Sequence, residues 1–343
     1  DITRREKKVR LDPHILNVLK SETVNKSSFI KFRNTGLTFS DIGGLGRLKN
    51  WFKIMQGGWT NEGRKFGLKT PKGAILIGLP GCGKTRAIEA LPNEWGLNYV
   101  EFDPSSVYSP RVGESEGNMR MALAIIESLS PCILGIDEID KGFSGTQSSS
   151  FSDAGTTSRT FGIFIIWMNN NLSSVFVAAT CNRIETLPPE LISRFDEIFY
   201  VGPPNVEERA DIIKLQIAEQ GRDPRKFNTS MLAEACPYLS GREIMQAMKE
   251  AMHIAFNVNH TDITDSIIRQ CLTKKTPVVK TMERQLESLV KWVGFDEKTK
   301  DGIRARFANN EMDEYDQLFR EILTNSEKTG YGEAGSDDLQ SQF

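Results

Sequence analysis

The sequence is poor in cysteine and histidine, with five of the former and three of the latter among 343 residues. The cysteines are odd in number and scattered, without the paired spacing of a zinc site or a disulfide framework, which indicates reduced, mostly buried thiols of an intracellular protein. The histidines lie far apart and show no ligand spacing, which favours structural or solvent-exposed roles. Disulfide-bonded secreted scaffolds and histidine-based metal sites are therefore disfavoured.

Long apolar runs and a large charge of one sign are also missing. No uninterrupted apolar stretch approaches the roughly 20 residues needed to cross a bilayer, and the start shows no secretory pattern. Because 43 basic residues face 45 acidic ones, the net charge is only −2, which argues against a protein that is wholly a nucleic-acid or membrane-surface binder. We expect a soluble, intracellular protein without a membrane span. The sequence begins with Asp1, so an upstream targeting segment is left open.

What the sequence does contain is an alternation of apolar and amphipathic segments from residue 39 to about residue 202. This pattern predicts an α/β fold, a parallel sheet covered by helices on both faces, with strands at residues 74–77, 97–102, 132–137, 175–179 and 197–201. Gly202-Pro203-Pro204 ends the pattern. The sequence after it is helical and predicts a small all-helical lid domain, with helices at residues 206–219, 229–236, 241–257 and 262–271.

A glycine-rich loop ending in Lys84-Thr85 is the most informative motif. An apolar stretch at 73–77 precedes it and a helical segment at 86–91 follows, which is the strand, loop and helix context of a P-loop NTPase. Glycines let backbone N–H groups surround a phosphate, the lysine adds charge near the β and γ oxygens, and the threonine offers a hydroxyl to Mg²⁺. The predicted ATP-binding residues here are Pro80, Gly81, Cys82, Gly83, Lys84, Thr85 and Arg86.

Two adjacent carboxylates, Asp137 and Glu138, follow the apolar run 133–136. We predict that Asp137 helps Thr85 to hold Mg²⁺ and that Glu138 is the catalytic residue that polarises the attacking water. An ordinary acidic turn is the alternative reading. Since two carboxylates at the end of a buried strand are costly to place, the P-loop upstream favours the catalytic interpretation.

Joined to residues 177–183 and 187–196, these motifs resemble those of a AAA+ ATPase with a second region of homology. The sequence is most similar to the ycf-type AAA proteins of chloroplast genomes and cyanobacteria, over about residues 37–304. Segments that carry the resemblance include Asp41-Ile42-Gly43-Gly44-Leu45, Val112-Gly113-Glu114-Ser115-Glu116 and Arg194-Phe195-Asp196-Glu197-Ile198-Phe199. The resemblance implies a location in the cytoplasm or the plastid stroma.

The resemblance implies two further catalytic residues. Asn182 is similar to sensor 1, an amide that orients the attacking water or binds the γ-phosphate; a helix cap or turn is its alternative role. Arg194 is similar to the arginine finger that reaches the ATP of the neighbouring subunit, which implies a homo-oligomer, in this family a hexamer. A guanidinium there neutralises charge on the transferring phosphoryl group; a structural salt bridge is the alternative.

Other positions are similar to the family's nucleotide contacts. Asp41, Ile42 and Gly44 match the segment whose backbone and apolar side chain hold the adenine. Arg242 opens a helix of the predicted lid and is similar to a sensor 2 that brings charge onto the phosphates; a surface arginine is the alternative. In the central pore loop, protein-threading relatives have an aromatic residue where this chain has Arg111, with Tyr108 three residues earlier. A cationic pore would suit an acidic tail or a phosphate backbone, and a contact with a neighbouring subunit's carboxylate is the alternative.

We therefore divide the chain into a basic N-terminal helical arm (1–36), an AAA+ α/β nucleotide-binding domain (37–203), a helical lid domain with C-terminal helices (204–310) and a partly disordered tail (311–343). The leading hypothesis is an oligomeric Mg-ATP hydrolase that remodels a macromolecule, a protein rather than a nucleic acid. A slow ATP-dependent assembly switch and a nucleic-acid motor or loader are the alternatives.

Overall fold

A computed structural model describes residues 29–109, 111, 113–143, 154–170, 174–258, 261–295, 301–309 and 322, with only the backbone described for 154–157. The described residues form a seven-stranded sheet in the order β1-β3-β4-β5-β2-β6-β7. Its strands are β1 (Ile30–Arg33), β2 (Gly73–Ile77), β3 (Asn98–Phe102), β4 (Cys132–Ile136), β5 (Val175–Cys181), β6 (Glu197–Tyr200) and β7 (Arg306–Phe307). Every pair is parallel except β1 with β3. The α/β prediction is confirmed.

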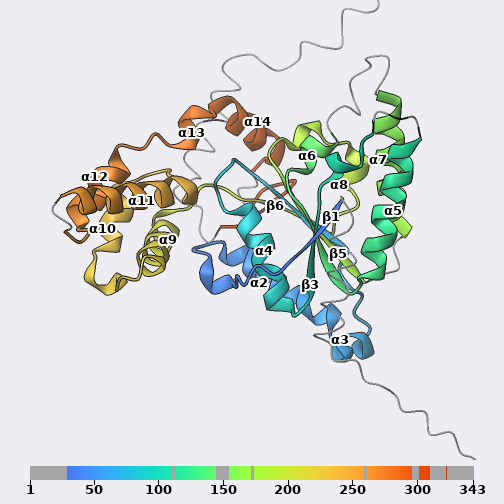
Figure 1. Ribbon diagram of the computed structural model, residues 1–343, viewed down its shortest axis with the longest axis horizontal. Helices are drawn as coiled ribbons and strands as arrows, with labels where there is room; N and C mark the ends of the chain where they lie inside the picture. Colours follow the sequence, from blue (N-terminus) through green and yellow to red (C-terminus); the bar gives the residue numbers. More distant parts are fainter. Residues whose placement is uncertain are drawn as a thin grey trace, which may run out of the picture.

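The central strands are apolar because both faces of the sheet are covered. Every residue of β2, β4 and β5 is buried, as expected for parallel strands between helix layers. Figure 1 shows α5 (Glu114–Ser128) and α7 (Ala154–Asn170) on one side of the sheet, and α2 (Gly46–Met55) and α4 (Lys84–Trp95) on the other. Shorter helices are α3 (Asn61–Phe66), α6 (Ile139–Gly142) and α8 (Pro189–Ile192).

Four helices form a second unit with its own hydrophobic core, drawn in yellow and orange in Figure 1. They are α9 (Val206–Glu219), α10 (Thr229–Glu234), α11 (Gly241–Asn257) and α12 (Asp265–Thr273). α9 and α11 have the predicted bounds, and each begins at a capping box that fixes its first residue, Asn205 with Glu208 and Ser240 with Glu243. The bounds of α10 and α12 differ from the prediction by two or three residues at an end.

After α12 the chain returns to the sheet, so the segment 204–310, for which we expected a helical lid domain and C-terminal helices, divides between the helical unit and the large domain. α13 (Val278–Thr281), α14 (Glu283–Val293) and β7 belong to the core of the large domain. The apolar side of α14 packs there through Leu286, Leu289, Val290 and Val293, so the helical unit ends near residue 273. The spacing of these four residues in the sequence indicates that one side of α14 is buried. It does not indicate whether that side packs on the core of the large domain or on the core of the helical unit.

The predicted helical arm also departs from the structure, because residues 30–33 form the edge strand β1. Residues 1–28 and the predicted tail, apart from residue 322, lie outside the described residues. All five cysteines are free and buried, as predicted. Within the described ranges, no helix combines the length and the apolar character needed to span a membrane.

Candidate nucleotide site

A cavity of about 320 Å³ lies between the carboxyl ends of β2, β4 and β5 and the helical unit. It is lined by residues from the P-loop, from the β4 and β5 ends and from α9 and α11. Most of the residues predicted from sequence line it: Asp41, Ile42, Pro80, Gly81, Cys82, Gly83, Lys84, Thr85, Arg86, Asp137, Glu138, Asn182 and Arg242. Gly44 and Arg194 are described but are not among the lining residues.

The P-loop between β2 and α4 is shaped by glycines that no larger residue could replace. Gly78 has φ of +150°, and a Cβ there would lie 2.2 Å from the carbonyl oxygen of Val201. Gly81 has φ of +87°, and a Cβ there would lie 3.0 Å from Ser240 Oγ at the start of α11. The loop then enters α4, whose first-turn N–H groups have no partner within the helix and favour an anion. This loop has the shape and the donors that a phosphate needs.

Lys84 places a positive charge inside the cavity. Its side chain is 6 % exposed, and its Nζ donates to Gly78 O at 2.8 Å, Leu79 O at 2.9 Å and Asn182 Oδ1 at 2.9 Å. Burial lowers the pKa of Lys84, because an ammonium group loses hydration there. A phosphate oxygen would be a stronger partner than a neutral carbonyl for this ammonium.

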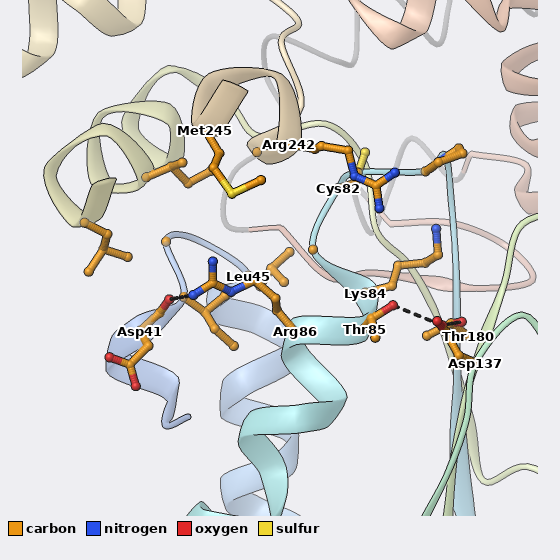
Figure 2. Close-up of a pocket in the computed structure, with 18 of the residues that line it drawn as sticks. Asp41, Leu45, Cys82, Lys84, Thr85, Arg86, Asp137, Thr180, Arg242 and Met245 are labelled. Carbon is orange, nitrogen blue, oxygen red and sulfur yellow. Dashed lines mark hydrogen bonds between the residues drawn. The ribbon is translucent and has the colours of Figure 1, made fainter. Parts of the chain in front are cut away.

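Two hydroxyl groups hold the Asp137 carboxylate. Thr85 Oγ1 donates to Asp137 Oδ1 at 3.0 Å, and Thr180 Oγ1 donates to the same oxygen while accepting from Glu138 N at 2.8 Å. Figure 2 shows Thr85, Asp137 and Thr180 together at one end of the cavity. Thr180 is absent from the sequence-based set. The feature of the sequence that could have indicated Thr180 is its hydroxyl group in an otherwise apolar strand, two residues before Asn182.

Asn182 connects Lys84 with Glu138. Its Nδ2 donates to Glu138 Oε1 at 2.9 Å, and the other Glu138 oxygen forms an ion pair with Lys141. This contact raises the pKa of Lys141. Glu138 has φ of +49°, a left-handed conformation that is costly for a residue other than glycine and is often found at functional sites. The Asn182 amide therefore contacts both the Lys84 ammonium group and the Glu138 carboxylate, at the place where the γ-phosphate of a nucleotide would lie.

The oxygen atoms of Thr85 and Asp137 suit Mg²⁺, which prefers hard ligands. Among the residues that the structure describes, no group of three His, Cys, Asp or Glu side chains could hold a metal ion. Mg²⁺ is commonly held by one or two carboxylates together with substrate phosphates and water. The residues present therefore fit a magnesium ion that arrives with a nucleotide.

The opposite end of the cavity is apolar. Leu45 follows the predicted adenine segment, and Ile212, Leu215 and Met245 come from α9 and α11; Figure 2 shows Leu45 and Met245 on the side away from Asp137. No motif marks the three residues from the helical unit, which only the fold brings to the cavity. A cavity with one cationic and one apolar end suits a ligand with phosphates and a flat base.

Asp41 and Arg86 lie at the apolar end, where Asp41 presents its backbone. The Asp41 carboxylate accepts from Thr38 N at 2.7 Å and from Thr38 Oγ1 at 2.8 Å, and these hydrogen bonds lower the pKa of Asp41. Arg86 Nη2 lies 3.5 Å from Asp41 O, the contact dashed in Figure 2, and 3.2 Å from Glu219 Oε1 of α9. The Asp41 carboxylate is therefore turned toward its own loop.

Arg242 brings the start of α11 onto the P-loop. Its backbone N donates to Gly81 O at 3.2 Å, and Figure 2 shows its guanidinium group on the same side of the cavity as Lys84. The helical unit thus contacts the loop directly.

Arg194 lies at the other end of the sheet. It comes shortly before β6. Asp196, two residues after it, donates its backbone N–H to the carbonyl oxygen of Gly73, where β2 begins. The cavity begins where β2 ends, a strand length of roughly 15 Å away. Arg194 Nη1 donates to Asn169 Oδ1 at 3.0 Å, whereas its buried Nε finds no acceptor in the part of the chain that the structure describes.

The predicted pore residues differ in their surroundings. Arg111 is exposed and pairs with Glu114 of its own chain at 3.2 Å. Tyr108 is partly buried, and its hydroxyl donates to Gly142 O at 3.3 Å. Neither residue lines the cavity.

Residues 74–203 match the model of the ATPase family associated with various cellular activities (AAA). The matched segment begins in β2 and runs through the P-loop, β4, β5 and β6. The chain therefore carries an AAA domain of the α/β P-loop NTPase fold, as its motifs predict.

The chain is similar to the AAA domain-containing protein ycf46 of Guillardia theta, with 38 % identity over 80 % of this chain and 54 % of the relative. It has the same identity, 38 %, to ycf46 of Pyropia yezoensis, over 80 % of this chain and 56 % of the relative. Similarity at 28 % identity extends to the ATP-dependent zinc metalloprotease FtsH 2 of a Thermoanaerobacter species, over 74 % of this chain and 52 % of that protein. The chain spans little more than half the length of these relatives.

Thr180→Val tests the contact between β5 and the two carboxylates. Valine keeps the shape of the buried Thr180 but leaves the partly buried Glu138 N–H without this acceptor and Asp137 without this donor, so the free energy of unfolding should fall by about 1–3 kcal/mol. Urea denaturation measures the change. The control is Thr281→Val, whose exposed hydroxyl bonds only a carbonyl group of its own short helix; it should shift stability by less than about 0.5 kcal/mol. Equal midpoints for both variants would contradict the structural role of Thr180.

Proposed function

We propose that this protein hydrolyses Mg-ATP in the cavity between the large domain and the helical unit. The observation that carries the proposal is the meeting of Lys84, Asn182 and Glu138, joined by contacts of 2.9 Å, beside the Thr85 and Asp137 pair. These side chains come from the ends of the adjacent parallel strands β4 and β5 and from the P-loop that follows β2, the next strand in the sheet. They combine the buried Lys84 ammonium group, the Asn182 amide and the Glu138 carboxylate, the kinds of group that phosphoryl transfer to water requires.

Each residue has a separable role in this proposal. Lys84 exchanges its carbonyl partners for β and γ oxygens, and the α4 N-terminus binds the remaining phosphate charge. Thr85 and Asp137 hold Mg²⁺, which supplies neutralisation of phosphate charge when bound. Asn182 orients the attacking water, and Glu138 polarises it and accepts its proton.

The position of Arg194 supports catalysis between subunits. Because a full strand length separates Arg194 from the cavity of its own chain, any nucleotide that its guanidinium group contacts would belong to a neighbouring copy. We propose a homo-oligomer, a hexamer as in related ATPases, in which each Arg194 completes an adjacent site. An arginine supplied in this way stabilises the charge of the transition state.

The coupling between nucleotide and helical unit supports a remodelling function. Arg242 and Met245 of α11 and Ile212 of α9 line the same cavity as the P-loop, so a nucleotide would contact both units and bias their relative position. We propose a protein rather than a nucleic acid as the substrate, because the net charge is −2 and Arg111 is already paired with Glu114. The relative FtsH 2 is named an ATP-dependent protease.

A slow ATP-dependent switch is the second candidate. The observation that favours it is the ion pair between Glu138 and Lys141, because a carboxylate whose two oxygens are held by Lys141 and Asn182 must give up one of these partners before it can contact a water molecule. Release of this pair on binding a partner would then control turnover. We also keep two expectations from the sequence as proposals. One is the division into domains, with the limits that the fold revises, and the other is a location in the cytoplasm or the plastid stroma.

Glu138→Gln tests the hydrolytic role. Glutamine can still accept from Asn182 but cannot take a proton, so ATP should bind with unchanged affinity while turnover per subunit falls by at least about a hundredfold. Turnover is measured across a protein concentration series, where the wild type should gain specific activity as the oligomer forms. Glu234→Gln, on the exposed side of α10, is the control and should behave as the wild type. Normal turnover in Glu138→Gln would remove this residue from catalysis, and flat, negligible turnover in the wild type would favour the switch.

Arg194→Ala tests catalysis between subunits. The variant should bind ATP as the wild type does and lose about a thousandfold in hydrolysis, because the transition-state charge loses its partner. When it is mixed into wild-type oligomers, activity should fall more steeply than the fraction of variant added. Arg225→Ala, at a fully exposed arginine that pairs with Asp223, is the control for charge removal. A loss strictly proportional to the fraction of Arg194→Ala would mean that Arg194 does not act across an interface.

A further inference from the structure

Glu208 is a buried carboxylate that the sequence marks only as part of the α9 capping box. It lies in the first turn of α9 and is 1 % exposed. Burying a carboxylate is costly unless donors surround it. Here Oε1 accepts from Leu45 N at 2.9 Å, and Oε2 accepts from Asn205 N at 3.1 Å and from Asn309 Nδ2 at 2.8 Å. The group therefore joins the loop before α2, the beginning of α9 and the segment after β7.

The loop that Glu208 contacts is the predicted adenine segment. Leu45 has φ of +58°, a left-handed conformation that is unfavourable for leucine and needs support from its surroundings. A Cβ on Gly44 would lie 2.7 Å from the Glu208 carboxyl group, and a Cβ on Gly43 would lie 2.6 Å from Ile212, one turn further along α9. Because neither glycine has a Cβ, α9 can pack closely against the loop. The hydrogen bond from Leu45 N to Glu208 then fixes the orientation of Leu45, the residue after Gly44.

The segment 301–309 supports the same loop from another direction. Ala308 O accepts from Leu48 N at 3.2 Å in the first turn of α2, and Asp301 forms an ion pair with Arg47. Asn309 is 1 % exposed, and its Oδ1 accepts from Gly202 N at 2.9 Å. Its amide is therefore oriented so that Nδ2 faces Glu208.

We propose that Glu208 is a positioning residue for the base of the nucleotide. It does not line the cavity and acts through Leu45 and Gly44, which it holds in the conformation that forms the apolar end. The inference rests on the proposed ATP site. It assigns to Glu208 a contribution to binding of the adenine base and none to binding of the phosphates, which Lys84 and the P-loop hold at the other end.

The test is Glu208→Gln, an isosteric change. Glutamine has one acceptor oxygen, so its NH₂ must face either Leu45 N–H or the two donors from Asn205 and Asn309. We expect the Kd for Mg-ATP to rise about tenfold, the typical effect of losing a buried bond to a charged acceptor. The Kd for Mg-tripolyphosphate, which lacks the base, should change less than about twofold. Both are measured by isothermal titration calorimetry on the full chain.

Glu207→Gln is the matched control, because Glu207 is exposed on the same helical turn and carries the same charge. It should leave both Kd values unchanged. If Glu208→Gln does not fold, Asn309→Ala removes one donor to the same carboxylate and should weaken Mg-ATP by about threefold with tripolyphosphate unchanged.

Equal weakening of both ligands, or no weakening of Mg-ATP, would overturn the assignment while leaving the ATP site in place. A wild-type protein that binds neither ligand would instead overturn the proposed function, and with it this role of Glu208.

Discussion

The buried ammonium group of Lys84 is the interaction on which the site depends. An ionised group away from water is tolerated only where oxygen atoms replace its hydration, and here Gly78 O, Leu79 O and Asn182 Oδ1 do so. These acceptors come from the ends of β2 and β5, which are neighbours in the sheet. The parallel arrangement is therefore a requirement of the chemistry, because only strands that run the same way bring their carboxyl ends, and the polar loops that follow, to one edge.

The same parallel arrangement separates the two halves of the proposed catalytic set. Residues that follow strands, such as Asp137 and Asn182, meet at the cavity, whereas Arg194 precedes β6 and so lies at the far edge. A chain of this fold cannot bring its own Arg194 to its own cavity without breaking the sheet. The oligomer that we propose would resolve this geometry, because a neighbouring copy could present the far edge of its sheet to the cavity of the first.

Local patterns predicted much of this structure. The bounds of α9 and α11 match because capping residues fix them, and each predicted strand overlaps an observed one because buried parallel strands are apolar runs between turns. The motif residues other than Gly44 and Arg194 line the cavity, because a motif is a local arrangement of strand, loop and helix. Contacts between distant parts of the chain could not be predicted in this way. Glu208 reads as an ordinary helix-capping residue, and the apolar side of α14 does not reveal that it packs on the large domain.

Contacts from α9 and α11 join the cavity to the helical unit, and of the residues that make them sequence reasoning had found only Arg242. α9 carries Glu208 to the base loop and Ile212 to the apolar end, while α11 carries Arg242 to the P-loop. A ligand shifts the position of a domain only by as much as its contacts differ between the two positions. A nucleotide bound as we propose would contact the helical unit at both ends, through its base at α9 and at Met245 of α11, and through its phosphates near Arg242. Loss of the γ-phosphate would weaken only the α11 contacts and leave α9 held by Glu208, so the expected motion is a rotation of the helical unit about the base end of the cavity rather than its release.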